Sequence, residues 1–356
     1  MTTLDTTWPA VLAWRLERQF VSTPGPDPVS VARRLCGIQA QVASAAELAI
    51  AVRLGAAPRG DVGRALWQDR TLIKTWLMRG TLHLIPAGEL PAYCGALGSL
   101  RFWEKGSWLR GHGVTAAEVD AIIDAVPRAL REGPLTREEL TEAIIELTGD
   151  GHLREALTSG WGVLLKPLSF LGQLCYGPPR EGRVTFASPG IVPLPVQEAG
   201  VRLLRAFLGA HGPATPEMFD AWLFRGMARK AVLRGWFEAL RPELAEVTVE
   251  GRTLFALAEH LDALAAARPV ETVHLLPGFD QYILGAPRDL APLLPTEARA
   301  KVSRTAGWIS PVVVYRGRVA GVWEAKSGRP VFDLFEEVPE PLLTPAADRI
   351  SALLAQ

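Results

Sequence analysis

The stretch Cys36-Gly37-Ile38-Gln39-Ala40-Gln41-Val42-Ala43-Ser44 places two glutamines in a short link between two predicted helices. Asp27-Pro28 is typical of an N-cap followed by proline at the first helical position, so a helix is predicted from there to about Cys36, where Gly37 ends it. Ser44-Ala45-Ala46-Glu47 has the sequence of a capping box and predicts the start of the next helix. In an extended link, alternation points both glutamine amides the same way, toward the amino-terminal end of that second helix. The link is therefore a candidate site for holding a water molecule or a polar ligand.

The sequence on either side of the link predicts the order helix, helix, helix, hairpin. Residues 8–20 carry apolar side chains at near-helical spacing and predict an amphipathic helix. The two helices that flank the glutamines follow it. Residues 72–86 then have β-branched and apolar side chains on both sides of Arg79-Gly80, the pattern of a β-hairpin. This order is that of a winged-helix module.

The same order recurs along the chain, which indicates an internal repeat. Gly133-Pro134-Leu135-Thr136 precedes a predicted helix in which Thr136 and Glu139 form a capping box, and Gly212-Pro213-Ala214-Thr215 opens another helix. A longer helix is predicted over 153–170, and strand pairs are predicted around 174–176 with 184–186 and over 245–249 with 253–257. A repeated Gly-Pro-x-Thr start at a period of about eighty residues predicts three winged-helix units in tandem.

These patterns divide the chain into four predicted parts. Residues 1–115 form a first winged-helix module with an N-terminal helix and the Gln-x-Gln link, 116–195 a second module, 196–268 a third, and 269–356 a C-terminal segment. In that segment, 312–315 and 319–323 are predicted to pair across Arg316-Gly317-Arg318, and Thr344-Pro345 to open a closing helix. The predicted fold class is mainly α with short β-hairpins, an α+β fold.

Composition limits the classes of protein to which the chain can belong. Its 356 residues contain no apolar run long enough to cross a membrane, and its three cysteines suggest neither a disulfide framework nor a zinc site, so a soluble cytoplasmic protein is expected. The net charge of +0 argues against a protein that coats nucleic acid. The charge is uneven, however, because residues 299–329 hold seven basic side chains against Glu324 alone. One face is therefore predicted to meet a polyanion.

Two glutamines can support chemistry only on an unusually reactive substrate, because glutamine does not titrate and is no ordinary general base. The simpler interpretation of Gln39 and Gln41 is capping of local backbone. A purine alkylated at N7 carries a formal positive charge, so its glycosidic bond is already weakened and the base leaves neutral. An enzyme then needs mainly to place a water near C1′ and to offer acceptors to an oxocarbenium-like sugar. Two amide oxygens can do both.

Other candidate groups are fewer. His83 lies in the first predicted hairpin, either packed or lining a channel, and the six histidines show no metal-ligand spacing with one another or with the cysteines. Neither a metal nor a cofactor is expected, since the chain has no glycine-rich phosphate loop, nucleophile elbow or recognisable Cys/His pair. Asp280 and Glu47 are the carboxylates nearest to the segments of interest. Either could replace a glutamine as the group that activates water.

An ordered set of motifs resembles the AlkZ/YcaQ superfamily of winged-helix DNA glycosylases over nearly the whole chain. The motifs are Gly37-Ile38-Gln39-Ala40-Gln41, the segment from Thr75 to His83, Leu275-Leu276-Pro277-Gly278-Phe279-Asp280-Gln281-Tyr282 with Arg288-Asp289, and Gly307-Trp308-Ile309-Ser310-Pro311-Val312. The Gln-x-Gln pair matches the AlkZ-like branch, whereas the YcaQ-like branch has aspartate in the second place. The resemblance implies tandem winged helices around a concave DNA channel and monofunctional removal of N7-alkylated purines. It also implies DNA repair or self-resistance to DNA-alkylating natural products, in some members by unhooking interstrand crosslinks.

The resulting hypothesis is an alkylpurine DNA glycosylase that acts as a monomer on double-stranded DNA and is nucleoid-associated when bound. Gln39 and Gln41 position the hydrolytic water and stabilise the sugar cation, and His83 is a possible channel residue. Predicted phosphate contacts are Arg79, Arg304, Arg316 and Arg318. Whether the target base is extruded stays open. The alternative is a non-catalytic protein, either a tandem winged-helix regulator or a protein that sequesters a DNA-reactive drug.

Overall fold

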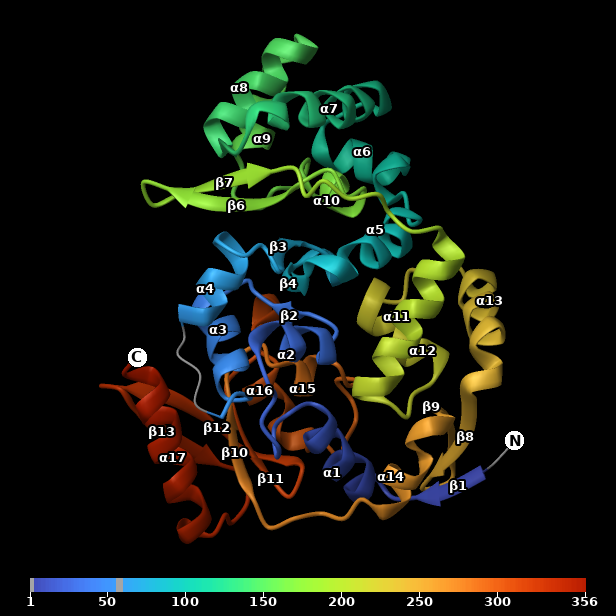
Figure 1. Ribbon diagram of the computed structural model, residues 1–356, viewed down its shortest axis with the longest axis vertical. Coiled ribbons are helices and arrows are strands. Elements are labelled where there is room, and N and C mark those ends of the chain that lie inside the picture. Colours follow the sequence, from blue (N-terminus) through green and yellow to red (C-terminus); the bar gives the residue numbers. More distant parts are fainter. Residues whose placement is uncertain (1–2, 56–59) are drawn as a thin grey trace. The chain divides into compact units, whose positions relative to one another are not determined.

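The computed structural model describes residues 3–55 and 60–356, which divide into two compact units. The first unit combines the chain up to Gly63 with Leu204–Gln356, and the second unit is Arg64–Leu203. Two helices, α4 (Gly60–Trp67) and α11 (Val196–His211), carry the chain across the two boundaries (Figure 1). Helices predominate and the sheets are small, as predicted from the sequence. The division into winged-helix modules stays a prediction.

The first two helices of the first unit begin where the sequence predicted, α1 at Trp8 and α2 after its predicted cap Asp27. Helix α1 (Trp8–Arg18) follows Thr7, whose side chain accepts from the backbone of Ala10, and α2 (Pro28–Arg34) follows Asp27, whose side chain accepts from the backbone of Ser30. Both helices have proline in the first turn, where its missing N–H costs nothing. After the short strand β2 (Ile38–Gln39) comes α3 (Ala43–Ala51). The predicted capping box at Ser44 is wrong: Val42 is the N-cap and provides no side-chain bond, because Ser44 already lies inside the first turn.

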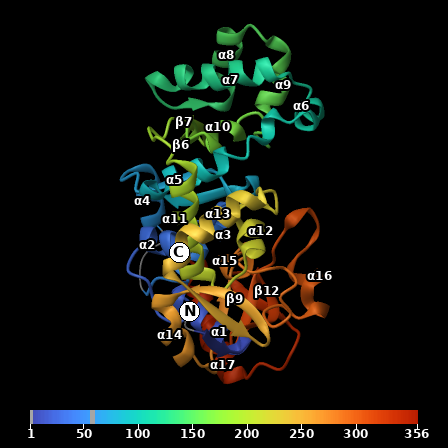
Figure 2. The same ribbon diagram turned by 90° about the vertical axis from the view of Figure 1, so that its right-hand side faces the viewer.

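A small sheet joins the start of the chain to its middle. Strands β8 (Leu244–Val249) and β9 (Arg252–Leu257) form the predicted hairpin around Glu250-Gly251, and β1 (Thr3–Thr6) adds to β8 in parallel. Helices α12 (Pro216–Phe224) and α13 (Lys230–Leu240) precede this hairpin as predicted, and α14 (Leu261–Ala266) follows it. Figure 2 shows α14 beside α1, where the two helices pack together. The parallel pairing of β1 has no local sequence signal, since its partner is more than two hundred residues away.

The C-terminal part of the first unit is built on a four-stranded antiparallel sheet. Its strands run in the order β10 (Val273–Leu276), β11 (Val312–Tyr315), β12 (Arg318–Lys326) and β13 (Arg329–Leu334). The predicted hairpin around Arg316-Gly317 is confirmed, whereas β13 was not predicted. Two short helices, α15 (Gln281–Leu284) and α16 (Arg299–Val302), lie in the long connection between β10 and β11.

The closing helix α17 spans Glu340–Leu354, so the predicted start at Thr344-Pro345 is wrong. Pro341 occupies the first turn and Pro345 lies inside the helix. Proline at this second position removes one backbone bond, to the carbonyl of Pro341, and the helix continues because its apolar side packs on the core. Ile350 is 2% exposed in the same cluster as the sheet residues.

The second unit begins with the predicted hairpin of β3 (Leu72–Trp76) and β4 (Leu82–Pro86), in which Trp76 pairs with Leu82. Its helices are α5 (Leu90–Gly98), α6 (Gly106–His112), α7 (Ala116–Ala129) and α8 (Arg137–Thr148). Thr136 caps α8 and forms the predicted capping box with Glu139. A small sheet follows with strand order β5 (Leu135–Thr136), β7 (Arg183–Ala187) and β6 (Cys175–Arg180).

The long helix predicted over 153–170 is wrong. The chain forms only α9 (Arg154–Thr158) and α10 (Lys166–Phe170). Between them Gly162 has φ +60°, and a Cβ built on it would lie 2.5 Å from the ring of Trp76. The close approach to the indole therefore requires glycine here, and its left-handed backbone keeps α9 and α10 from forming one continuous helix.

Short 3₁₀ turns complete the described part of the chain, at Met78–Gly80, Ala87–Glu89, Phe102–Glu104, Leu130–Glu132, Gly151–Leu153, Arg241–Glu243, Ala258–His260, Thr296–Ala298 and Thr305–Gly307.

A buried ion pair connects the amino-terminal helices to the C-terminal sheet. Arg53 follows the C-cap of α3 and Asp280 is the N-cap of α15; both side chains are 0% exposed. The two guanidinium Nη atoms donate to the two carboxylate oxygens at 2.7 Å each, and Nε donates to the carbonyl of Gln19 at 2.9 Å. Asp280 also accepts from the backbone of Tyr282 at 2.8 Å. Such bidentate geometry offsets the desolvation that burial imposes on both charges.

We expect Asp280→Ala to lower the free energy of unfolding by about 3–5 kcal/mol, because it leaves a buried guanidinium without its counter-charge. Urea unfolding followed by tryptophan fluorescence measures this. Replacing both partners, Arg53→Met with Asp280→Leu, should recover part of the loss.

The matched control is Lys326→Ala, which breaks the exposed pair with Glu324 and should change stability by no more than about 1 kcal/mol. An Asp280→Ala protein as stable as this control would contradict a supporting role for the buried pair.

Candidate active site

The link that carries the glutamines starts at a tightly bonded helix end. The backbone N–H of Gly37 donates to the carbonyl of Ala32 at 2.8 Å, and that of Cys36 donates to the carbonyl of Arg33 at 3.1 Å. This pair of bonds is a Schellman motif, with Cys36 at φ +56° and Gly37 at φ +92°. A left-handed residue other than glycine costs about 1–2 kcal/mol, so this turn is held by its surroundings. The predicted end of α2 is confirmed, but the first left-handed residue after the C-cap Leu35 is Cys36 rather than Gly37.

The two glutamines lie in different environments. Ile38 and Ala40 are each 1% exposed and Gln39 is 6% exposed, whereas Gln41 is exposed. The extended strand ends at Gln39, and the chain bends at Gln41 before α3 begins. The condition for the predicted parallel orientation, a link extended through both residues, is therefore not met. One amide belongs to the protein interior and the other reaches solvent.

The amino-terminal end of α3 follows directly after Gln41. Its N-cap Val42 makes no side-chain bond, and its first turn contains no acidic residue. The first N–H groups of a helix have no partner within the helix and carry the positive end of its dipole. Such an end favours an electron-rich atom, as in the oxygen of an attacking water or a backbone phosphate.

The structure separates the two candidate carboxylates. Asp280 has both oxygens bonded to Arg53 and one also to the backbone of Tyr282, in a fully buried position. The proposed use of Asp280 as the water-activating group is therefore wrong, because it is committed to a structural pair. Glu47 lies on α3, half-buried, and is the carboxylate nearest to Gln41 along the chain.

His83 and Arg79 belong to the β3–β4 hairpin of the second unit. His83 is 0% exposed, and its Nδ1 lies 2.9 Å from the carbonyl of Thr81. Burial and, next, the charge of Arg79 lower the pKa of His83 to about 3, so the ring is neutral at physiological pH. This burial argues against a direct contact between His83 and DNA. Arg79 is half-buried at the turn, with φ +59°.

The three C-terminal arginines are exposed, and acidic side chains lie beside two of them. Arg316 Nε is 3.5 Å from Glu271 and Arg318 Nε is 3.7 Å from Glu336, while Arg304 donates to the carbonyl of Lys301 at 3.4 Å. Exposed pairs of this kind contribute about 0–1 kcal/mol, so either arginine can exchange its carboxylate for a phosphate.

The predicted basic face is partly neutralised in the folded chain. Lys301 pairs with Asp333 at 2.7 Å and Lys326 with Glu324 at 2.6 Å. The first pair depends on the unpredicted strand β13, which pairs with β12 and carries Asp333, whereas Glu324 lies on β12 two residues from Lys326. Separation of charge along the sequence is therefore not separation in space.

A second group of arginines surrounds an open pocket in the first unit that sequence reasoning missed. Arg33 and Arg34 form the last turn of α2, and the pocket of about 400 Å³ is also lined by Arg18, Arg205 and His260. Arg18 donates to the carbonyl of Gly209 at 2.9 Å, and Arg34 donates to the carbonyl of Arg18 at 3.1 Å. Burial and, next, the charge of Arg34 lower the pKa of Arg18. The neighbouring positive charges repel each other, and an anion in the pocket would relieve this repulsion.

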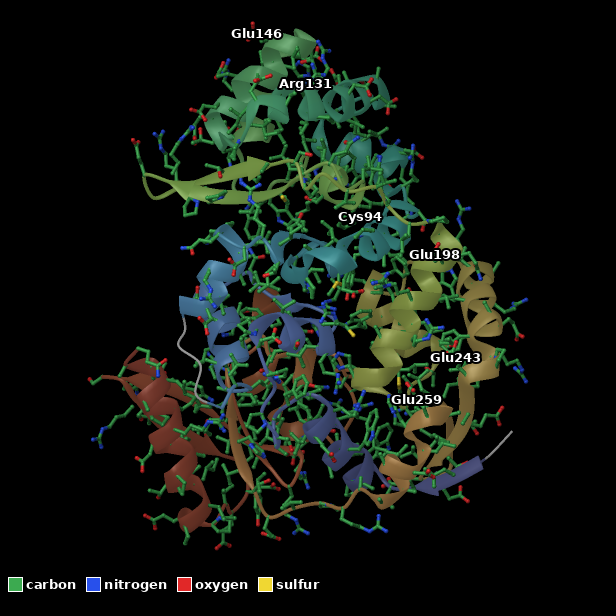
Figure 3. All side chains as sticks on the ribbon, in the orientation of Figure 1. Cys94, Arg131, Glu146, Glu198, Glu243 and Glu259 are labelled. Carbon is green, nitrogen blue, oxygen red and sulfur yellow. The ribbon has the colours of Figure 1, made fainter. Side chains whose placement is uncertain are left out.

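Two glutamates lie at the edge of this pocket. Glu259 lines it, and Glu243 forms a bidentate pair with Arg205 at 2.5 and 2.7 Å; both glutamates are labelled in Figure 3. Arg205 therefore has a counter-charge of its own. The adjacent pair Arg33-Arg34, three residues before the link, was the sequence signal that could have located the pocket.

Folding also gathers three possible metal ligands that have no recognisable sequence spacing. Ligand atoms of Glu118, Asp150 and His152 in the second unit lie within 4.8 Å of one another. Glu118 already accepts from the backbone of Thr115 at 2.6 Å and lies 3.1 Å from His152, so its carboxylate caps α7.

Among the described helices, none is long and apolar enough to cross a membrane.

Comparisons with known proteins cover nearly the whole chain. The family model described as DNA glycosylase AlkZ-like matches residues 32–355. An interstrand DNA cross-link repair glycosylase of Streptomyces sahachiroi is 45% identical over 330 residues, which are 90% of this chain and 88% of that protein. The solved structure of the Streptomyces sahachiroi DNA glycosylase AlkZ matches with a TM-score of 0.95 and 42% identity, covering 99% of this chain and 98% of that one. The chain therefore belongs to the AlkZ-like family of DNA glycosylases, enzymes that act on N-glycosyl bonds.

Proposed function

We propose that this protein hydrolyses the N-glycosidic bond of N7-alkylated purines in double-stranded DNA, with Gln39 and Gln41 positioning the water. The observation that carries the proposal is the link itself, in which a buried and an exposed glutamine lie two residues apart in the chain, just before a helix end without a side-chain cap. Membership of a family of enzymes disfavours the alternative of a non-catalytic regulator or drug-sequestering protein.

The enzyme does not need to protonate the leaving base, because alkylation has already activated the substrate. Alkylation at N7 puts a positive charge on the purine. When the bond from C1′ to N9 breaks, both electrons stay with the base, which leaves neutral. The sugar becomes oxocarbenium-like, the water oxygen bonds to C1′, and a proton passes to solvent. Amide oxygens of Gln39 and Gln41 accept hydrogen bonds from the water and so aim its lone pair at C1′.

Burial gives the two amides different parts in this scheme. Gln39 is held in a poorly hydrated place, where the partial negative charge of its oxygen acts more strongly on a developing cation than it would in water. Gln41 is exposed and can reach the substrate and the water as they enter.

The enzyme would work as a monomer without cofactor, on chromosomal DNA in the cytoplasm.

The lesion is proposed to be bulky. A relative that is 45% identical is named for repair of interstrand DNA crosslinks, which supports a substrate larger than a methylated base. Winged-helix modules over 1–115, 116–195 and 196–268 would provide the duplex-binding surface. Backbone phosphates would contact the arginine pocket beside α2, together with Arg79, Arg304, Arg316 and Arg318.

Substitution of either glutamine tests the reaction directly. On a duplex with one N7-methylguanine, Gln39→Ala and Gln41→Ala should each slow single-turnover base release by about 10²–10³-fold, because the water loses an oriented acceptor. Strand breakage after mild alkali measures release, and the dissociation constant for the duplex should stay within about twofold.

The matched control is Gln68→Ala, an exposed glutamine just beyond α4, which should release base at the wild-type rate. Full activity in the Gln39→Ala/Gln41→Ala double variant would rule out this site. If the wild type also releases no methylated base, a duplex crosslinked through N7 of two guanines decides whether the lesion must be larger.

Charge removal tests the proposed phosphate contact of the arginine pocket. Arg33→Gln with Arg34→Gln should weaken duplex binding and reduce the slope of log affinity against log salt by about 1–2, one for each lost phosphate contact. Fluorescence anisotropy at several salt concentrations measures the slope.

Arg268→Gln, which removes one exposed arginine after α14, serves as the control and should leave the slope unchanged. An unchanged slope in the double variant would place the DNA backbone elsewhere.

A further inference from the structure

The carbonyl that precedes the link is held by a side chain from a distant helix. Leu35 is the C-cap of α2 and is 0% exposed, and its carbonyl oxygen lies 3.3 Å from Nε2 of His211, the last residue of α11. The carbonyls of Ala32 and Arg33 are already bonded within the turn. The imidazole therefore bonds the backbone immediately before the left-handed pair Cys36-Gly37, four residues from Gln39.

The partners of His211 define its tautomer. A carbonyl oxygen only accepts, so Nε2 must carry the proton that is donated to Leu35. Nδ1 lies 3.1 Å from Nε2 of Gln19, an amide nitrogen that only donates, so Nδ1 must be the acceptor. The same amide nitrogen lies 3.0 Å from the carbonyl of Ala210, which fixes the amide orientation. One neutral form of His211 satisfies every contact.

Packing against neighbouring rings and backbone also fixes the position of the imidazole. His211 is 1% exposed and lies beside the rings of Phe207 and Trp222, with centroids 5.4 and 6.2 Å away. A Cβ built on Gly285 would lie 2.0 Å from Nδ1, so the ring lies directly against the backbone after α15. No side chain at that position could coexist with this imidazole.

The chain of bonds continues to the buried ion pair. Gln19 is 0% exposed, and its backbone carbonyl accepts a hydrogen bond from Nε of Arg53 at 2.9 Å. Arg53 is in turn paired with Asp280. Leu35 is therefore tied through His211 and Gln19 to the most deeply buried charges of the first unit. The imidazole is neutral and the two charges are paired with each other, whereas the side-chain oxygen of Gln19 is buried without a hydrogen-bond partner among the described residues.

We propose that His211, oriented by Gln19, is a positioning residue for Gln39: it holds the Leu35 carbonyl and so places the buried amide for its water. The proposal rests on the function proposed above for the link. Gln39 follows the held carbonyl through only three residues, two of which have unusual left-handed backbone. Misplacement of a reacting group by about 1 Å can cost about 10²-fold in rate, so a lost anchor should appear in the chemical step.

The decisive comparison is His211→Phe, which keeps a ring without its bonds, against His211→Gln, whose amide can still donate to Leu35. Single-turnover base release should fall about 10- to 100-fold in His211→Phe with duplex affinity within about twofold, and His211→Gln should recover most of the rate. In a Gln39→Ala background, His211→Phe should cause no further loss, because it acts through that amide. His274→Phe, a half-buried histidine on β10, is the control with an unchanged rate.

Hydrogen exchange gives a readout independent of activity. Backbone amides of residues 36–42 should exchange faster in His211→Phe than in the wild type, while those of β11 and β12 stay unchanged. If His211→Phe fails to fold, Gln19→Met takes its place in both measurements, because it removes the amide that donates to Nδ1 of His211 and to the carbonyl of Ala210.

Each outcome decides between the two claims. A wild type that releases base from neither the N7-methylguanine duplex nor the crosslinked duplex overturns the proposed function, and the exchange result still decides whether His211 holds the link. Base release at equal rates by wild type and His211→Phe overturns the positioning role alone. Equal losses in His211→Phe and His211→Gln, multiplicative losses with Gln39→Ala, or unchanged exchange would also overturn it.

Discussion

The pair between Arg53 and Asp280 is the interaction on which the first unit depends. It is bidentate, has no exposure to solvent, and joins the end of α3 to the start of α15, segments that are 227 residues apart in the chain. A buried pair like this contributes little net stability over apolar packing, yet it tolerates only one geometry, because every unpaired charge in the interior is costly. The pair therefore fixes the position of α3 at its carboxyl end, and the Gln-x-Gln link lies at the opposite end of the same helix.

The link combines rigidity on one side with access on the other. Schellman bonds and the left-handed Cys36 and Gly37 define how the chain leaves α2, and Ile38 and Ala40 bury the backbone around Gln39. Gln41 is exposed. Amides do not titrate, so in the proposed function this site would act by placement rather than by proton transfer, and the surrounding interior holds Gln39 in place. The proposed substrate carries a positively charged base that leaves as a neutral molecule. For such a substrate, correct placement of the attacking water is sufficient for hydrolysis.

Charge in this protein is arranged locally rather than by excess. The net charge is +0, and several basic residues near the C-terminus have acidic neighbours in exposed pairs. Beside α2, by contrast, Arg18, Arg33 and Arg34 line one open pocket in which Glu259 is the carboxylate. In the proposed function, these are the places where a backbone phosphate would replace a weak or repulsive contact.

Local signals in the sequence determined much of this protein: the caps at Asp27 and Thr136, the turns at Arg79-Gly80 and Glu250-Gly251, the helix-and-hairpin order, and the two glutamines in a link between helices. Each rests on residues within a few positions of one another, where backbone geometry and side-chain bonding are decided locally. Only the tertiary structure decided that Gln39 is buried and Gln41 exposed. It also decided that Asp280 pairs with Arg53 and that β13 places Asp333 beside Lys301. The contact between His211 and the carbonyl of Leu35 likewise appears only in the folded chain. Burial and pairing depend on segments brought together from far along the chain, and no local pattern carries that information.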